Sequence, residues 1–299
     1  MNSSPTAAPA TPIRWPAEAI WEAVAPSLPG FTVEVLPEID STNSELMRRF
    51  RGSTGAPPRP EPLLLVAEQQ TAGRGRSGRS WESQRGGSLT FSLGLPLQPT
   101  DWSGLSLAVG ISLAESLDPR PAGQPAIGLK WPNDLWICGQ TREGERKLGG
   151  ILVETASWDG IRYVVIGVGI NILPLQLAAP ALPTGSSAAP ATTAIPPGCL
   201  QDLLPGVDPG EALLRTLPPL VQAVQAFEQF GFAPFQARFS ARDVLAGRAV
   251  RLSDGTEGTA HGVSESGALR VHTAAGMKEI TSSEVSVRPV SAAGDNRPC

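Results

Sequence analysis

The chain has 299 residues, of which 41% are hydrophobic and 17% are charged. This composition excludes a wholly disordered protein, and no apolar run reaches the ~20 residues that a membrane-spanning helix needs. The formal net charge of −4 at pH 7 argues against binding of nucleic acid by the whole surface, although a short basic patch is compatible with it. We therefore expect a globular, enzyme-sized protein that is not bound to a membrane.

The cysteines and the N-terminus indicate the cytoplasm. Three widely separated cysteines, Cys138, Cys199 and Cys299, form no CxxC pair and have no metal-ligand spacing, so a disulfide framework is not expected. The first residues are polar and contain no basic segment followed by an apolar run and a small-residue cleavage site, so they predict no secretion signal.

Helices and strands alternate along most of the chain. In chain order, periodicity and turn residues predict a helix at 16–25, a strand at 32–36, a helix that follows the capping residues 40–43 and ends near 51, strands at 63–67 and 88–95, a helix at 105–117, strands at 127–130, 135–138, 147–156 and 161–170, and helices at 211–230 and 234–239.

Other segments lack this periodicity. Residues 69–87 are rich in Gly and Arg and predict a long functional loop, and a polar hairpin is expected at 139–146. Residues 174–209 are rich in Pro and Ala and predict a long, partly disordered insertion. Residues 1–30 form a leader that is disordered up to residue 12.

The pattern changes from Gly247 onward. Short alternating runs, separated by Asp-Gly, Ser-Gly and Ala-Gly turns, predict a small β-barrel. We therefore divide the chain into an α/β domain at 31–243, a barrel at 244–290 and a tail at 291–299.

The run Gly73-Arg74-Gly75-Arg76-Ser77-Gly78-Arg79-Ser80-Trp81 is the strongest local signal. Glycines let the backbone wrap around an anion, and guanidinium groups can chelate phosphate or carboxylate oxygens in pairs, so the run predicts an acyl phosphate or nucleotide site. It is neither a Walker loop nor a dinucleotide fingerprint. A solvated loop or an RNA-binding segment is the alternative.

Two of the three lysines stand beside turn residues at strand ends. Lys130 opens the sequence KWPND, Lys147 opens KLGGILVE, and Lys278 is the third; the other cations are all Arg. A chain that uses Lys so rarely favours a functional role for both over the alternative of surface lysines. The sequence GVGIN ends at Asn171, which either reads a nucleobase edge or caps its strand.

Nucleophilic catalysis is not supported. The histidines are His261 and His272, both in the expected barrel, and the chain contains neither a G-x-S-x-G elbow nor a Cys beside a His.

Together these motifs resemble biotin protein ligases. The resemblance covers nearly the whole chain: DSTN at 40–43, AEQQTA at 67–72, the Gly/Arg run, KWPND, KLGGILVE, GVGIN, and a barrel that opens with AGR at 246–248 and closes with EVSVRP at 284–289. The departures are Ser77, where many members carry a basic residue, the 174–209 insertion, and the missing N-terminal helix-turn-helix domain of bifunctional members. We therefore expect no DNA binding.

The resemblance implies an α/β (α+β) catalytic domain, with a mixed sheet and helices on one side, followed by an SH3-like barrel. It also implies ATP-dependent biotinylation of a lysine on a biotin carboxyl carrier protein through biotinyl-5′-AMP, with ATP, biotin and Mg²⁺. It leaves a homodimer open and assigns no metal ligand.

The resemblance, together with the charges, implies three sets of site residues. The catalytic set is Lys147, Arg76, Lys130 and Asp134. The biotin set is Ser41, Thr42, Asn43, Gln70, Arg74, Gly75, Arg76, Lys147, Gly149 and Gly150. The nucleotide set is Arg76, Arg79, Trp81, Asn133, Lys147 and Asn171. Two alternatives remain: a lipoate or octanoate transferase of the same fold, and a nucleic-acid-binding regulator.

Overall fold

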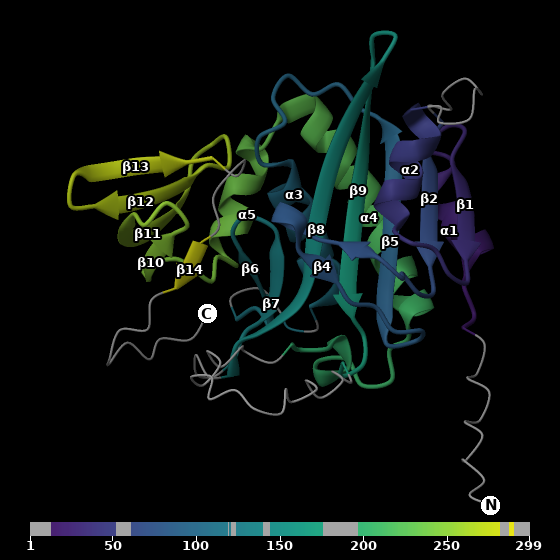
Figure 1. The fold of residues 1–299 in the computed structure, drawn as a ribbon, viewed down its shortest axis with the longest axis horizontal. Helices are drawn as coiled ribbons and strands as arrows, with labels where there is room; N and C mark the ends of the chain where they lie inside the picture. Colours follow the sequence, from purple (N-terminus) through teal and green to yellow (C-terminus); the bar gives the residue numbers. More distant parts are fainter. Residues whose placement is uncertain are drawn as a thin grey trace, which may run out of the picture.

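A seven-stranded mixed sheet forms the centre of the molecule (Figure 1). The computed structural model describes residues 13–51, 61–118, 120, 124–139, 144–175, 197–281 and 287–289. In spatial order the strands are β1 (Thr32–Leu36), β2 (Leu63–Ala67), β5 (Ser88–Pro96), β9 (Ile161–Asn171), β8 (Arg146–Trp158), β7 (Asp134–Ile137) and β6 (Ile127–Lys130). The β1–β2 pair is parallel and the other neighbours are antiparallel, as a mixed sheet requires.

Helices cover both faces of this sheet unequally. The first face carries α1 (Ala17–Val24), α3 (Leu105–Leu117) and α4 (Pro209–Phe230), whereas α2 (Thr42–Arg51) packs on the second face (Figure 1). Strand β2 shows the cause, because Leu64 and Val66 join the core of the first face and Leu65 joins the α2 cluster. The expectation of helices on one side therefore holds for three helices and is wrong for α2.

The helix α4 begins two residues before its predicted start. The Asp208 side chain accepts a hydrogen bond from the Glu211 N–H at 2.8 Å and so caps the helix. Pro209 occupies the first turn, where its missing N–H costs nothing. The helix ends at Phe230, and Gly231 follows as its C-cap with a φ of 66°. A short turn (Ala233–Phe235) and α5 (Gln236–Ser240) follow it.

The expected barrel is confirmed as five antiparallel strands. They are β10 (Ala249–Leu252), β11 (Glu257–Val263), β12 (Leu269–Thr273), β13 (Gly276–Ile280) and β14 (Val287–Pro289), in the order β13-β12-β11-β10-β14. The barrel packs against the α/β domain through the buried Trp131 indole, which donates to the Gly267 carbonyl at 3.1 Å. The buried Arg248–Glu145 ion pair also joins the two parts.

Two segments are more ordered than their composition predicts. The loop at 69–87 contains a hairpin of β3 (Gly73–Arg74) and β4 (Ser80–Trp81), joined through a 3₁₀ turn (Arg76–Gly78). At the end of the insertion, a 3₁₀ turn (Leu200–Asp202) buries Leu200 in the core. Both were expected to be irregular because such short elements have no periodicity to detect.

Several expectations fall outside the described residues. These are the disordered part of the leader at 1–12, the centre of the polar hairpin at 140–143, residues 176–196 of the insertion, the barrel residues 282–286, and 290–299 with Cys299. Within the described ranges, none of the helices combines the length and apolar character that crossing a bilayer would demand.

Candidate active site

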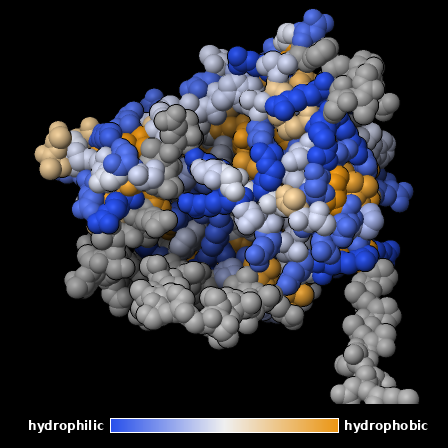
Figure 2. Space-filling view, viewed as in Figure 1, coloured by the Kyte–Doolittle hydropathy of each residue, from blue (hydrophilic) through white to orange (hydrophobic). Residues whose placement is uncertain are grey.

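A cavity of about 740 Å³, including its open mouth, lies on the second face of the sheet beside α2. Figure 2 shows the molecule hollowed near the centre of this face, with hydrophilic side chains around the hollow. Of the predicted site residues, those that line the cavity are Ser41, Thr42, Asn43, Gln70, Arg74, Gly75, Arg76, Arg79, Trp81, Asn133, Asp134, Lys147 and Gly150. The fold thus brings together motifs that lie more than 100 residues apart in the chain.

Glycines of β9 create the floor of this cavity. A Cβ at Gly167 would lie 2.1 Å from Asn43 Oδ1, and a Cβ at Gly169 would lie 2.4 Å from Trp81 Cε2. Because alternate residues of a strand share a face, both positions open toward α2 and the β3–β4 hairpin. Both glycines belong to the GVGIN motif, but neither was among the predicted site residues.

A neutral polar group occupies one end of the cavity. Gln70 Oε1 accepts hydrogen bonds from the Thr42 backbone N–H at 2.8 Å and from the Thr42 hydroxyl at 3.2 Å. The Gln70 backbone N–H in turn donates to Ser83 Oγ at 2.7 Å. These contacts hold amide and hydroxyl groups together at the start of α2, an arrangement suited to an uncharged ligand that both donates and accepts hydrogen bonds.

The rest of the cavity is strongly cationic. Its described lining residues include four cations, Arg74, Arg76, Arg79 and Lys147, and a single carboxylate, Asp134. Lys147 Nζ donates to Asp134 Oδ1 at 2.8 Å. Burial lowers the pKa of the Arg76 guanidinium, and the nearby Asp134 charge opposes this shift. An excess of positive charge in a partly buried cavity favours an anionic ligand.

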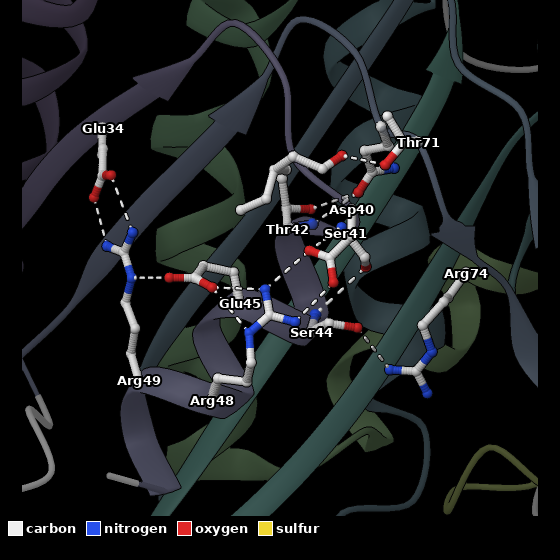
Figure 3. Close-up of polar contacts among 12 residues, drawn as sticks. Glu34, Asp40, Ser41, Thr42, Ser44, Glu45, Arg48, Arg49, Thr71 and Arg74 are labelled. Atoms are coloured by element: carbon white, nitrogen blue, oxygen red, sulfur yellow. Dashed lines mark hydrogen bonds and ion pairs between the residues drawn. The ribbon is translucent and has the colours of Figure 1, made fainter. Parts of the chain in front are cut away.

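Arg74 pairs with a carboxylate that lies outside the described cavity lining. Its guanidinium pairs with Glu154 of β8 at 3.1 Å and lies 3.3 Å from Ser44 Oγ on α2. Figure 3 shows Arg74 reaching toward Ser44 beside the helix. The Glu154 contact went unpredicted because nothing in the sequence says which cation a strand carboxylate will meet.

Trp81 lines the cavity and lies directly against β9. Its ring packs against Gly169, and its buried Nε1 has no hydrogen-bond partner within the described ranges. A buried donor of this kind is costly unless a ligand satisfies it.

Comparisons with known proteins identify the family. Residues 35–171 match the model of the Biotin/lipoate A/B protein ligase family, and residues 246–288 match that of the Biotin protein ligase C terminal domain. The bifunctional ligase/repressor BirA of Escherichia coli is 33% identical over 267 residues, which are 87% of this chain and 75% of BirA. The chain belongs to the biotin protein ligase family.

Two further relatives of this ligase are matched over almost their whole length. The biotin–acetyl-CoA-carboxylase ligase of Paracoccus denitrificans is 29% identical over 260 residues, which cover 84% of this chain and 98% of the relative. The structure of the Aquifex aeolicus biotin protein ligase in complex with biotin and ATP superposes with a TM-score of 0.64 and 29% identity, covering 86% of this ligase and 99% of that chain. The resemblance inferred from the motifs is thereby confirmed.

Three predicted site residues of the ligase lie away from the cavity lining. Lys130 Nζ lies over the Trp136 ring, 5.1 Å from its centroid, and lines a separate small cavity. Gly149 is buried, and a Cβ there would lie 2.6 Å from the Gly169 carbonyl oxygen. Asn171 is buried and its Nδ2 donates to the Gly198 carbonyl at 3.0 Å. The strand-capping interpretation of Asn171 fits this contact better than nucleobase recognition.

The described part of the ligase gathers no group of three or more His, Cys, Asp or Glu side chains that could hold a metal ion. Asp134, the carboxylate of the cavity lining, is already paired with Lys147.

Proposed function

We propose that this ligase uses ATP to attach biotin to a lysine of a biotin carboxyl carrier protein through biotinyl-5′-AMP. The observation that carries the proposal is one cavity with a neutral polar end and a cationic end. Biotin combines a neutral cyclic urea with a carboxylate, and ATP adds phosphates to the anionic end. The complex of the Aquifex relative with biotin and ATP supports this assignment.

The cations serve the first step. A carboxylate oxygen of biotin bonds to the α-phosphorus of ATP, and the bond to the β-phosphate bridge breaks, which releases pyrophosphate. Two anions must approach each other, so positive charge at the meeting point lowers the barrier. Lys147 and Arg76 are the residues proposed for this role, with Lys147 as a compact charge and Arg76 as a fork for two oxygens.

The remaining lining residues divide between the two substrates. Ser41, Thr42, Asn43 and Gln70 are proposed to surround the urea ring, with Arg74, Gly75 and Gly150 toward the carboxylate. Trp81, Arg79 and Asn133 are proposed for the nucleotide, whose ring or oxygen atoms could accept from the unpartnered Trp81 Nε1. The ATP phosphates would carry Mg²⁺, which Asp134, the carboxylate of the described lining, is proposed to reach through water while it stays paired with Lys147.

In the second step, the neutral amine of the carrier lysine bonds to the acyl carbon of the mixed anhydride, AMP leaves, and the amine loses a proton. Asp134 is proposed to orient this amine. Lys130, on the strand that runs into the same turn, is proposed to contribute to the acceptor side rather than to ATP, because it does not line the main cavity. The predicted compartment is the cytoplasm.

Biotin is favoured over lipoate or octanoate because the C-terminal match is to a biotin protein ligase domain. The test is ATP–pyrophosphate exchange with biotin, lipoate or octanoate, followed by transfer to a purified carrier domain. We expect exchange with biotin and labelling of the carrier lysine. Exchange with lipoate alone would overturn the proposal in favour of the transferase. Salt-sensitive nucleic-acid binding without any exchange would favour the regulator.

A further inference from the structure

The motif KLGGILVE ends in a carboxylate that the proposed mechanism does not use. Glu154 stands on β8, outside the described cavity lining. Its Oε1 accepts a hydrogen bond from Arg74 Nη2 at 3.1 Å, and its Oε2 accepts one from Arg74 Nη1 at 3.3 Å. Oε2 also accepts from Asn43 Nδ2 at 3.0 Å. One carboxylate therefore joins the β3–β4 hairpin, the helix α2 and the central sheet.

The β3–β4 hairpin needs attachments of this kind. Its two strands form a small sheet of their own, separate from the seven-stranded sheet. An isolated two-stranded hairpin is at best marginally stable in water. The hairpin nevertheless supplies Arg76, Arg79 and Trp81 to the cavity lining. The way in which it is attached to the rest of the domain therefore decides where these side chains lie.

Three attachments hold the hairpin within the described residues. The Trp81 ring lies against Gly169 of β9, at the end of the second hairpin strand. The Ala72 backbone N–H donates to the Asp40 carbonyl at 2.9 Å, just before the first hairpin strand. The forked contact of Arg74 with Glu154 is the attachment that reaches β8.

This ion pair fixes position more than it adds stability. The Arg74 and Glu154 side chains are 48% and 23% exposed, and pairs this exposed contribute little to the free energy of unfolding. A carboxylate that receives two N–H groups of one guanidinium still restricts its orientation strongly. Loss of the pair should therefore leave the protein folded and allow the hairpin to open locally.

We propose that Glu154 is a positioning residue that fastens the β3–β4 hairpin against the cavity through Arg74. Glu154 touches neither substrate. It holds the hairpin so that Arg76, Arg79 and Trp81 lie where a bound ligand meets them. This effect on the ligand rests on the proposed function, whereas the fastening itself is a property of the ligand-free protein.

The first test is amide hydrogen exchange by NMR, with the ligand-free full chain as Glu154→Gln, Arg74→Gln and the double variant. Gln at position 154 keeps an oxygen that can accept from Asn43 but loses the charge and the second acceptor of the fork. The Gly75 and Arg79 amides are hydrogen-bonded within the hairpin, and we expect them to exchange about tenfold faster in each single variant. The double variant should match the single variants, because all three lose the same contact.

Glu34→Gln is the matched control. The Glu34 carboxylate receives both Nη groups of Arg49, and the two side chains are about as exposed as the Arg74–Glu154 pair. This fork joins α2 to β1 and not to the hairpin (Figure 3). We therefore expect Glu34→Gln to leave the exchange of the hairpin amides unchanged.

The second test measures the kinetics of Glu154→Gln. We expect the KM for biotin and the release rate of biotinyl-5′-AMP to rise about tenfold, since the loosened hairpin must be ordered again each time a ligand binds. The kcat of adenylation should stay within twofold of wild type, because this cost applies equally to the ground state and the transition state. A partly unfolded variant would instead lose kcat along with its active fraction.

Three results overturn the proposal: wild-type exchange of the hairpin amides in the single variants, additive effects in the double variant, or faster hairpin exchange with an unchanged KM for biotin. If Glu154→Gln does not fold, Arg74→Gln alone carries the exchange comparison, because Arg74 is half exposed. Absence of any biotin-dependent pyrophosphate exchange in the wild type would refute the proposed function but leave the result on the ligand-free hairpin intact.

Discussion

Replacing Lys147 should slow adenylation without unfolding the protein. The Lys147 side chain is 41% exposed, and its ion pair with Asp134 is 2.8 Å long. Exposed pairs of this kind contribute about 0–1 kcal/mol to folding, so Lys147→Ala should remain folded. Loss of one preorganised charge at the reacting carboxylate should raise the barrier to adenylation by about 2–4 kcal/mol, which lowers the rate roughly 30- to 1000-fold.

The assay is single-turnover formation of biotinyl-5′-AMP at saturating biotin and ATP. Lys147→Arg keeps the charge but replaces a compact ammonium with a planar fork, so we expect a smaller but clear loss. Lys278→Ala is the control, because Lys278 is 49% exposed and lies 3.4 Å from Asp254 in the barrel. Adenylation by Lys147→Ala at the wild-type rate would show that Lys147 is a surface lysine and refute the reasoning.

Three further predictions concern the cavity and the domain junction. Arg76→Ala should leave the fold intact but speed dissociation of biotinyl-5′-AMP, because the guanidinium that would bind the phosphate is gone. Stopped-flow release of the adenylate and labelling of unrelated lysines measure the dissociation, and an unchanged release rate would contradict the prediction. Gly169→Ala should weaken ATP binding by calorimetry, because its Cβ would lie 2.4 Å from a Trp81 ring atom, and an unchanged affinity would show that Trp81 does not meet the nucleotide. Burial raises the pKa of Asp243 from 3.8 to about 6, so the folded state loses stability as pH rises through that interval and the carboxyl ionises. The amide side chain in Asp243→Asn can still accept a hydrogen bond from the Leu245 N–H. We expect the variant to have a free energy of unfolding in urea that is higher than wild type by at most about 3 kcal/mol near pH 8 and almost unchanged near pH 4. The same pH dependence as wild type would count against this explanation.

The sequence by itself determined the elements and most of the candidate site. Periodicity predicted α4 because its buried residues recur at helical spacing, and it predicted the barrel strands because they alternate. The Gly/Arg run and the KWPND and KLGGILVE motifs predicted cavity residues, since rare residue types beside turns have a chemical use that can be read locally.

Only the tertiary structure decided which of these groups meet. Strand β2 carries apolar residues on both faces, so its sequence predicts burial of both. It does not predict which helix covers which face. Lys130 and Asn171 have the right chemistry for the site, but their strands direct them to Trp136 and to the Gly198 carbonyl instead. A motif gives the residue type, whereas the sheet register gives its neighbours.

The buried hydrogen bonds beneath Thr42, where Ser92 Oγ lies 2.7 Å from Thr42 Oγ1 and 2.6 Å from Asn43 Oδ1, show the same limit most clearly. Asn43 and Glu154 are 111 positions apart, and Ser92 is one of many serines in the chain until β5 brings it under α2. Whether these groups form hydrogen bonds depends on the distances between their atoms and on the exclusion of water. Both are set only after the strands have paired. Local sequence patterns carry no information about either quantity.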